Sequence, residues 1–457
     1  MSKPSIPKGT RDFGPVAMAR RQWIFSTIRK VFEKHGFLPI NTPSFENLQT
    51  LTGKYGEEGD RLIFKILNNG DYLSKASEEA LESRNSIALT PTISKKALRF
   101  DLTVPFARFV VMNRNELTFP FRRYQIQQVW RGDRPGKGRY QEFTQCDADI
   151  IGSTSTICEL DLVQILHEAL MELNIPGFTI HINDRRILSA LAEKLGVEST
   201  KLTDFTVAID KYDKIGIEGV VNELENRGFD KNVCRGIEKL FSANNSGDNE
   251  SVLDSITSLI PNNESCNTGL SEIRKLISRS KSLGISEPEI RFDSMLARGL
   301  DYYTGAIFEV RVKDFNVGSI CGGGRYDDLT GIFGWKGMSG VGISFGADRI
   351  EDVLEHFNLF PEYIEKSTDV LIANMSAEID DEIRLASELR LEGHCVEIFP
   401  DNVKLKKQMK YADDKSIPFV VIIGEDEKAS NSLTLKCMSS GAQTQLKKAE
   451  LKDHLSE

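Results

Sequence analysis

The sequence predicts a chain of several domains, in which the main part is an α+β fold and the end is a smaller α/β domain. Residues 121–152 have the pattern of two strands around a turn, residues 186–288 are charged with helical spacing, and strand and helix patterns alternate after about residue 365. We therefore expect a main domain of residues 1–185 and 289–365, a helical insertion of residues 186–288 and an α/β domain of residues 366–457.

Length and composition are those of an ordinary multidomain protein. With 457 residues, of which 40% are hydrophobic and 27% charged, the chain is long enough for roughly two to four domains. No apolar run approaches the ~20 residues that a membrane helix needs. The stretch "MSKPSIPKGTRDFGP" has no signal-peptide core either. We expect no contact with a membrane and a cytoplasmic location.

The charged and metal-binding residue types exclude some classes of function. A net charge of −9 argues against indiscriminate binding to nucleic acid, although local basic patches could still hold a polyanion. Seven cysteines and six histidines are scattered singly, without a C-x-x-C pair. Neither a structural zinc site nor a disulfide framework is therefore expected.

The first third of the chain contains a helix, an extended segment and an insertion. Residues 18–35 have apolar side chains at helical spacing, and Gly36 suits the end of a helix. "FLPINTPSFE" follows as an extended segment, which Pro39 and Pro43 would confine to the edge of a sheet. Residues 67–98 are polar and patternless, which predicts a surface insertion.

The rest of the chain reads as a hairpin, helices, glycine-rich strands and a final α/β alternation. Pro135 and Gly136 mark the turn of the hairpin, and "SANNSGDNESVLDS" predicts a flexible loop among the helices. Strand patterns return in "IFEVRV", "GSICGGGRYDDLTGIF" and "GMSGVGISFGADRI". From "DVLIANM" to "PFVVIIG", strands alternate with helices, which predicts a small domain with a largely parallel core sheet.

Polar side chains gather on one face of the predicted hairpin. Strand alternation places these residues on the same side: Gln127, Val129 and Arg131 from the first strand, and Phe143, Gln145, Asp147 and Asp149 from the second. Such a hairpin suits a nucleotide, because Arg131 could hold a phosphate, Phe143 could stack on a base and Arg139 in the turn could meet a polyphosphate. A solvated charged hairpin is an equal alternative.

Two other fragments carry residues that suit a small polar ligand. Asp101 and Thr103 share one side of an extended "DLT" and could bind an ammonium group, although D-x-T also forms turns and caps. In "ARGLDYYTG", Arg298 precedes Tyr302 and Tyr303, which offer an apolar wall with polar tips. A tyrosine pair in a core is the alternative.

Glycines and arginines recur in the last strands of the main domain. "CGGGRYDDL" permits a close approach of the backbone to a ligand, or forms a bulge. "GMSGVGISFGADRI" is a glycine-lined strand followed by Arg349 near the start of a helix. Arg131, Arg298 and Arg349 thus appear in three separate contexts that suit a phosphate.

In this order, these fragments resemble the histidyl-tRNA synthetases, a family of the class II aminoacyl-tRNA synthetases. "GFLPINTPSFE", "YQIQQVWRGDRPGKGRYQEF" and "GVGISFGADRI" are similar to the three class motifs. "ARGLDYYTG" and "GGGRYD" are similar to the two histidine peptides of the family, and "KGTRDFGP" matches as well. The resemblance covers nearly the whole chain. It implies a catalytic domain on a mostly antiparallel sheet, and an anticodon-binding module at the C-terminal end.

The resemblance also implies the residues of an ATP site and a histidine site. ATP would be bound by Arg131 at the α-phosphate, Asp133, Arg139 at the polyphosphate, Phe143 on the adenine and Arg349 at the γ-phosphate. Histidine would be bound by Asp101, Thr103 and Gln145 at the α-amino group, by Asp149, Tyr302 and Tyr303 at the imidazole, and by Arg298 at the carboxylate. The catalytic residues would be Arg298, Arg131 and Gln145.

Two of these positions depart from the usual pattern. Asp133 stands where the class usually has glutamate, and Asp149 where many bacterial relatives have glutamate. An aspartate is one methylene shorter, which moves the carboxylate by ~1 Å.

The implied function is a histidine–tRNA ligase that forms histidyl-adenylate from L-histidine and ATP and passes histidine to the 3′ end of tRNA(His). Mg²⁺ is implied as well, without ligands that the sequence identifies. A homodimer is implied through the first class motif. Four lysines suit contact with a tRNA backbone, or a solvated helix face: Lys404, Lys406, Lys407 and Lys410.

Two other functions compete with this one. A non-catalytic, histidine-binding paralogue that regulates another enzyme would keep the fold and part of the pocket, but such proteins typically lack the anticodon module. A sister class II synthetase is disfavoured by the two histidine-type peptides.

Overall fold

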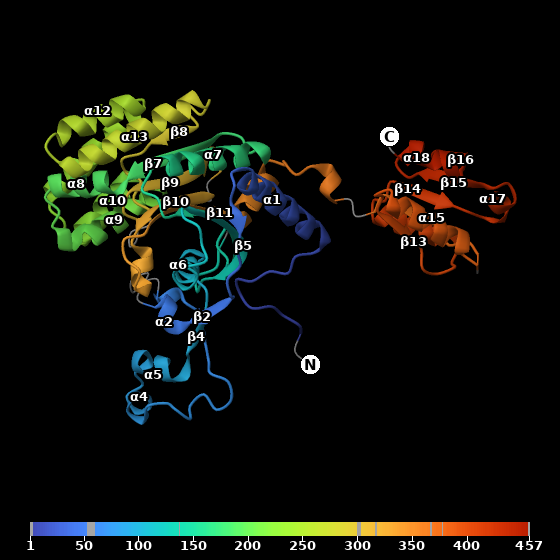
Figure 1. Ribbon diagram of the computed structural model, residues 1–457, viewed down its shortest axis with the longest axis horizontal. Coiled ribbons are helices and arrows are strands. Elements are labelled where there is room, and N and C mark those ends of the chain that lie inside the picture. Colours follow the sequence, from blue (N-terminus) through green and yellow to red (C-terminus); the bar gives the residue numbers. More distant parts are fainter. Residues whose placement is uncertain are drawn as a thin grey trace. The chain divides into compact units, whose positions relative to one another are not determined.

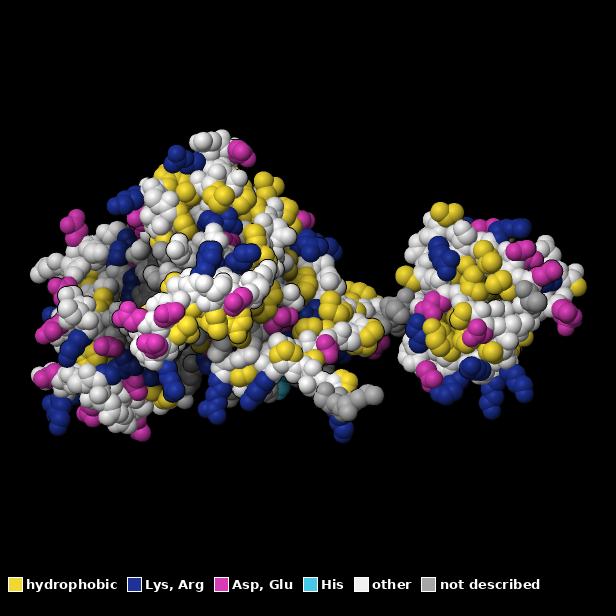
Figure 2. Space-filling model, turned by 90° about the horizontal axis from the view of Figure 1, so that it is seen from below, with side chains coloured by type: hydrophobic (Ala, Val, Ile, Leu, Met, Phe, Trp, Pro, Cys, Tyr) yellow, Lys and Arg dark blue, Asp and Glu magenta, His cyan; other side chains and the backbone are white. Residues whose placement is uncertain are grey.

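The computed structural model describes residues 3–52, 60–136, 138–298, 303–315, 318–365, 368–376 and 378–455. The chain forms two compact units, Met1–Leu359 and Phe360–Glu457, and each is considered by itself. No helix among the described residues is long and apolar enough to cross a membrane. On the face shown in Figure 2, acidic and basic side chains are interspersed over both units.

An eight-stranded sheet forms the centre of the first unit, in the order β1-β5-β6-β11-β10-β9-β7-β8. Only the two edge pairs, β1–β5 and β7–β8, are parallel; the other neighbours are antiparallel. The mostly antiparallel sheet is therefore confirmed. Its strands are β1 (Leu38–Pro39), β5 (Phe121–Trp130), β6 (Glu142–Ile151), β7 (Phe178–Asp184), β8 (Ile290–Phe292), β9 (Ala306–Val312), β10 (Cys321–Asp327) and β11 (Ser339–Gly346).

Three helices cover one face of this sheet: α1 (Pro15–Lys34), α7 (Ile157–Glu172) and α14 (Ala347–His356). On this face Phe32 of α1 packs against Tyr124 and Phe345, at centroid distances of 5.5 and 5.8 Å. The predicted first helix is confirmed, and Gly36 follows it with a φ of +77°. β1 lies at the sheet edge, as its prolines predicted. The opposite face is left for polar residues.

The hairpin of β5 and β6 is confirmed, and its register fixes which side chains meet. Gln127 lies opposite Gln145, Val129 opposite Phe143, and Arg123 opposite Asp149. Opposed residues of an antiparallel pair share a face of the sheet. The polar row predicted on β6 therefore continues across β5 and reaches Arg123.

A small antiparallel sheet, in the order β2-β4-β3, lies beside the large one. Residues 67–98 are not patternless: Ser77 and Asn85 cap two short helices there. Their side-chain oxygens accept hydrogen bonds from the backbone N–H groups of the first turns. The elements of this region are β2 (Phe45–Asn47), α2 (Leu48–Leu51), β3 (Lys65–Ile66), α4 (Glu78–Glu82), α5 (Ser86–Ile93), β4 (Lys96–Leu98) and α6 (Thr103–Met112).

Between β7 and β8 the chain is helical. The helices are α8 (Arg185–Lys194), α9 (Leu202–Asp210), α10 (Tyr212–Asn226), α11 (Lys231–Ser246), α12 (Asn249–Leu259) and α13 (Glu264–Ser282). The flexible loop predicted in "SANNSGDNESVLDS" is wrong, because only Gly247 and Asp248 separate α11 from α12. The Asp248 carboxylate accepts the N–H of Ser251 at 2.8 Å, so it starts a helix whose apolar side chains are buried.

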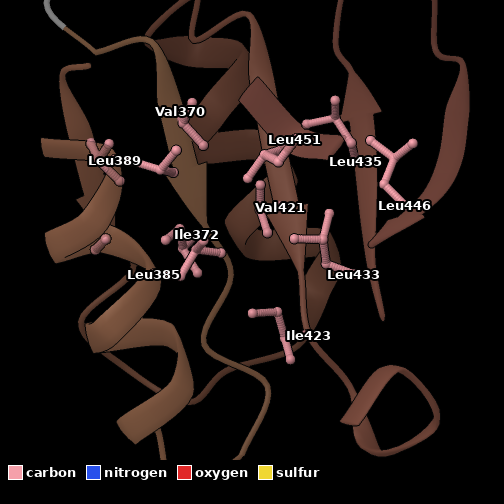
Figure 3. Packing of buried hydrophobic residues seen from close by; sticks show 12 residues of the cluster. Val370, Ile372, Leu385, Leu389, Val421, Ile423, Leu433, Leu435, Leu446 and Leu451 are labelled. Carbon is pink, nitrogen blue, oxygen red and sulfur yellow. The ribbon is translucent and has the colours of Figure 1, made fainter. Parts of the chain in front are cut away.

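The second unit has a five-stranded sheet in the order β13-β12-β14-β15-β16. β13, β12 and β14 are parallel, and β15 and β16 add antiparallel edge strands. Figure 3 shows Leu385 and Leu389 of α15 packed against Val370 and Ile372 of β12. The predicted α/β domain is confirmed. Its elements are β12 (Val370–Ile372), α15 (Asp380–Leu391), β13 (Val396–Ile398), α16 (Leu405–Asp414), β14 (Phe419–Ile422), α17 (Glu425–Ala429), β15 (Ser432–Cys437), β16 (Gln443–Lys447) and α18 (Leu451–Leu455).

Candidate active site

A cavity opens at the polar face of the eight-stranded sheet, over β6, β10 and β11. Side chains from these strands and from the segment before α6 line it, and they include six of the residues predicted from the sequence. The lining is Phe100, Asp101, Thr103, Arg131, Gln145, Asp147, Asp149, Tyr303, Gly322, Tyr326, Gly342, Ile343 and Ser344.

Asp101 and Thr103 reach the cavity from the start of α6, which begins at Thr103. The Asp101 side chain is buried, and its Oδ1 accepts the N–H of Val104 at 3.2 Å. The helix cap that "DLT" allowed is therefore confirmed, while binding of an ammonium group stays a prediction. The carboxylate caps the helix and at the same time faces the cavity.

Asp149 is held by two partners that the sequence analysis did not single out. Arg123, which is fully buried, places Nη2 2.7 Å from Asp149 Oδ2, and the Tyr326 hydroxyl donates to Asp149 Oδ1 at 2.7 Å. Burial raises the pKa of Asp149, and both partners oppose that rise. The carboxylate is thus fixed in orientation before any ligand arrives. Strand alternation places Arg123 on the same face of β5 as Gln127, but it does not identify the partner of Arg123.

Arg131 lies between two aromatic rings at the mouth of the cavity. Its guanidinium carbon is 4.4 Å from the centroid of Phe100 and 5.2 Å from that of Phe143. Its Nε donates to the carbonyl oxygen of Phe100 at 3.1 Å. These contacts hold the cation in place at the wall of the cavity.

Arg298 and Arg349 approach the same region from other elements. Arg298 Nη1 donates to the carbonyl oxygen of Cys321 at 3.2 Å, and its Nε lies 3.5 Å from Glu309 Oε2. Arg349 Nη1 donates to the carbonyl oxygen of Ser319 at 2.6 Å. Burial lowers the pKa of Arg349, and the positive charges of Arg298, Arg139 and Arg131 lower it further. Four guanidinium groups are therefore close enough to repel one another, an arrangement that a polyanion would stabilise.

Glycines make the room that these side chains occupy. A Cβ atom on Gly322 would lie 1.6 Å from Arg298 Nη1, and one on Gly342 would lie 2.0 Å from Asp149 Oδ1. A Cβ on Gly340 would meet the Tyr326 ring at 2.4 Å. The glycine-rich strands are therefore close-approach positions, not bulges.

The N-terminal strap, residues 7–13, ties the β5–β6 loop to α14. The N–H of Gln141 donates to the carbonyl oxygen of Gly9 at 2.8 Å. Arg11 stacks on Tyr140, with its guanidinium carbon 3.4 Å from the ring centroid, and pairs with Asp348 of α14. Since the loop carries Arg139 and α14 carries Arg349, the strap connects the two supports of the arginine cluster.

The other predicted residues are placed as follows. Phe143 lies on β6 beside Arg131, and Arg139 is exposed in the β5–β6 loop. The carbonyl oxygen of Asp133 accepts from Gln141 Nε2 at 3.0 Å. Tyr302 lies outside the described residues. Within the described ranges, no group of three or more His, Cys, Asp or Glu side chains could hold a metal ion, so no magnesium ligands are assigned.

A mostly antiparallel sheet that carries an arginine-bearing hairpin and a glycine-lined strand running into an arginine-bearing helix defines a class II aminoacyl-tRNA synthetase. The family model for histidyl-tRNA synthetase matches residues 71–350, and that for the anticodon-binding domain matches residues 369–457. The chain belongs to the histidyl-tRNA synthetase family, whose members use ATP and Mg²⁺ to attach histidine to tRNA(His).

Individual relatives support this assignment over nearly the full length. The chain is 51% identical over 446 residues to a histidine–tRNA ligase of Christiangramia forsetii and 50% identical over 444 residues to one of Cytophaga hutchinsonii; each alignment covers 97% of both chains. The crystal structure of histidyl-tRNA synthetase from Nostoc sp. PCC 7120 superimposes with a TM-score of 0.83 at 31% identity, covering 100% of this chain and 99% of that one.

Proposed function

We propose that this chain joins L-histidine to ATP to form histidyl-adenylate, with release of pyrophosphate, and then transfers histidine to the 3′ end of tRNA(His). One observation carries the proposal: a single cavity is lined by Asp101, Thr103, Gln145, Asp149 and Tyr303, with the arginine cluster at its edge. An amino-acid subsite and a polyphosphate subsite are thus neighbours.

The first step requires two negatively charged groups to meet. A carboxylate oxygen of histidine forms a bond to the α-phosphorus while the bond from that phosphorus to the pyrophosphate oxygen breaks. Arg131 and Arg298 stabilise the charge on the carboxylate and the α-phosphate as the transition state forms. Gln145, held by its Nε2 donating to Ser344 Oγ at 2.8 Å, orients the amino acid for attack.

Histidine is recognised at both of its ends. Asp101, Thr103 and Gln145 accept the α-ammonium group, while Asp149 binds the imidazole together with Tyr303 and Tyr302. Asp149 is suited to this role because Arg123 and Tyr326 fix its orientation. An imidazole N–H that finds a buried acceptor gains a strong hydrogen bond, whereas an isostere without it leaves that acceptor unpaired.

ATP extends from the hairpin to α14. Phe143 stacks on the adenine, Arg131 binds the α-phosphate, and Arg139 and Arg349 bind the polyphosphate. Asp133 belongs to the same site. The lowered pKa of Arg349 supports this placement, because the mutual repulsion that lowers it would be relieved by a polyanion.

The partners follow from the same proposal. The second unit contacts the anticodon of tRNA(His), and three exposed lysines of this unit meet the RNA backbone: Lys404, Lys406 and Lys407. Lys410 is less available, because it pairs with Asp414 at 2.7 Å. A homodimer forms through α1 and β1, and exposed Leu38 at the sheet edge supports this. The enzyme works in the cytoplasm.

Histidine-dependent exchange of labelled pyrophosphate into ATP tests the proposal. We expect exchange that requires histidine and is not supported by the other amino acids. A folded protein that binds histidine but gives no exchange would instead be the regulatory paralogue. Exchange with a different amino acid would identify a sister synthetase.

A further inference from the structure

Two buried acceptor atoms on β6 face the cavity without a donor. Gln145 Oε1 and Asp147 Oδ1 have no hydrogen-bond partner among the described residues, although their side chains are only 9% and 2% exposed. The two residues are separated by one position, so both side chains lie on the cavity face, and both line the cavity. Buried acceptors are normally paired, so two adjacent exceptions call for a ligand that donates to both.

The neighbours of Asp147 do not supply that donor. Gln125, opposite it on β5, directs its amide nitrogen to Thr42 Oγ1 at 3.1 Å and to Gln127 Oε1 at 2.7 Å. Arg123 is held by Asp149 at 2.7 Å, and Ser344 lies opposite Asp147 on β11. Both lower the pKa of Asp147, but neither donates a hydrogen bond to its Oδ1 atom. The Oδ1 atom of Asp147 thus remains available at the cavity wall.

We propose that Asp147 is the counter-ion of the substrate's α-ammonium group, and that it binds this group together with Oε1 of the Gln145 side chain. This inference rests on the proposed function and adds a specificity-determining residue to it. An ammonium group carries three N–H donors. Two can reach the unpaired acceptors on β6, and the third can reach Asp101 or Thr103 on the facing segment.

The electrostatics around Asp147 agree with this assignment. Burial raises the pKa of Asp147 to about 7, Asp149 and Asp101 raise it too, and Arg123 and the Ser344 hydroxyl oppose the rise. Asp147 therefore lies within electrostatic range of both Asp149 and Asp101, which line the same cavity. A bound ammonium would take the place of the proton and allow Asp147 to ionise.

The test combines removal of the Asp147 carboxylate from the protein with removal of the α-amino group from the ligand. Asp147→Asn in the full chain is compared with wild type by calorimetric titration of histidine and of 3-(imidazol-4-yl)propionate, which lacks only the α-amino group. We expect the Kd for histidine to rise roughly 10–100-fold and the Kd for the amine-free analogue to change less than about threefold, because a charge-assisted hydrogen bond is lost only with histidine.

Matched controls separate this result from general damage. Asp161→Asn removes a carboxylate that pairs with Arg122 at 2.7 Å on the opposite side of the sheet, and it should leave both Kd values unchanged. An equal loss for both ligands, or an unchanged Kd for histidine in Asp147→Asn, would overturn the assignment. Histidine binding without pyrophosphate exchange in wild type would contradict the proposed function alone.

Discussion

Single side chains at the candidate site are held in place by contacts with neighbouring main chain and side chains. Arg298 is the clearest example, because the Cys321 carbonyl and Glu309 hold it in the space that the missing Cβ of Gly322 leaves. Its side chain is one-third exposed. We expect a partly exposed ion pair of this kind to add little to stability.

We expect Arg298→Ala to lower histidine-dependent pyrophosphate exchange by roughly 10²–10³-fold, which corresponds to ~3–4 kcal/mol of transition-state stabilisation. Arg298→Lys keeps the charge but not the two-pronged geometry, so it should recover only part of the rate. Circular dichroism should show an unchanged fold. An exchange rate near that of wild type would remove Arg298 from the mechanism.

Asp147 also links function to stability at the residue scale. Its folded pKa of about 7 lies above the unfolded value of about 3.9, so the folded state holds more protons between these values and stability falls as pH rises through this window. Without histidine, Asp147→Asn should remove this loss. We expect its stability relative to wild type to increase by roughly 2–3 kcal/mol from pH 5 to pH 8.

Urea unfolding followed by tryptophan fluorescence measures this effect, because Trp23, Trp130 and Trp335 all lie in the first unit. If Asp147→Asn and wild type differ in stability by the same amount at both pH values, Asp147 stays ionised in the absence of histidine.

The site residues that could be predicted from sequence lie in fragments that resemble motifs of the family. Asp101, Gln145 and Tyr303 belong to such fragments, and the structure brings them to one cavity. Arg123 could not be assigned, because its partner is known only once the register of β5 against β6 places it opposite Asp149. Asp147 was predicted on the polar face of the hairpin. Only the three-dimensional structure shows that its Oδ1 atom has no hydrogen-bond donor among the described residues.

At the scale of elements, the N-terminal strap and the β5–β6 loop act as a unit. Arg11 joins them through its stacking on Tyr140 and its ion pair with Asp348. Asp348 in turn accepts from Arg21 of α1 at 2.8 Å and from the N–H of Thr144 at 2.9 Å. These contacts connect the loop that carries Arg139 to the helix that carries Arg349.

Arg11→Ala should therefore raise the KM for ATP about tenfold in the exchange assay while leaving the KM for histidine unchanged, because the loop would lose its anchor. Arg20→Ala is the matched control. It removes an exposed pair with Glu355 at 3.0 Å that also joins α1 to α14, and it should change neither constant. Equal increases in both constants would point to general loosening of the domain instead.

Helices and strands with a clear hydrophobic periodicity were predictable, and segments whose composition and periodicity disagree were not. The helix of residues 18–35 and the β5–β6 hairpin are as predicted. In residues 242–255, polar composition suggested a loop, but the Asp248 cap and buried Val252 and Leu253 outweigh it. The β15–β16 hairpin was missed because its strands are short and largely polar, with burial mainly on one side.

At the scale of the whole molecule, the two units have separate cores. The second unit buries its own clusters on either side of its sheet, including Val421 and Leu433 on one side and Leu371 and Val420 on the other. Each unit thus has the interior that independent folding requires. The order of the eight strands was not predictable from sequence, because it joins segments as distant as β6 and β11.

Ending the chain after Glu365 should therefore spare pyrophosphate exchange within about threefold and lower the charging of tRNA(His) by at least about 100-fold, since anticodon contacts would be lost while the cavity stays intact. Both rates are measured on the same preparation. Tryptophan fluorescence reports on the first unit and should match that of the full chain. An equal loss of both rates in a folded truncation would contradict a separate role for the second unit.

Gly322 and Gly342 have a consequence for how the substrate pocket tolerates change. The side chains of Arg298 and Asp149 pack directly on the main chain at these glycines, so the hydrogen-bonded pair of β10 and β11 limits how these side chains can move. We expect the exclusion of bulkier amino acids to vary little with temperature. Surface residues of the enzyme can then change during adaptation to cold or heat without a change in its selectivity for histidine.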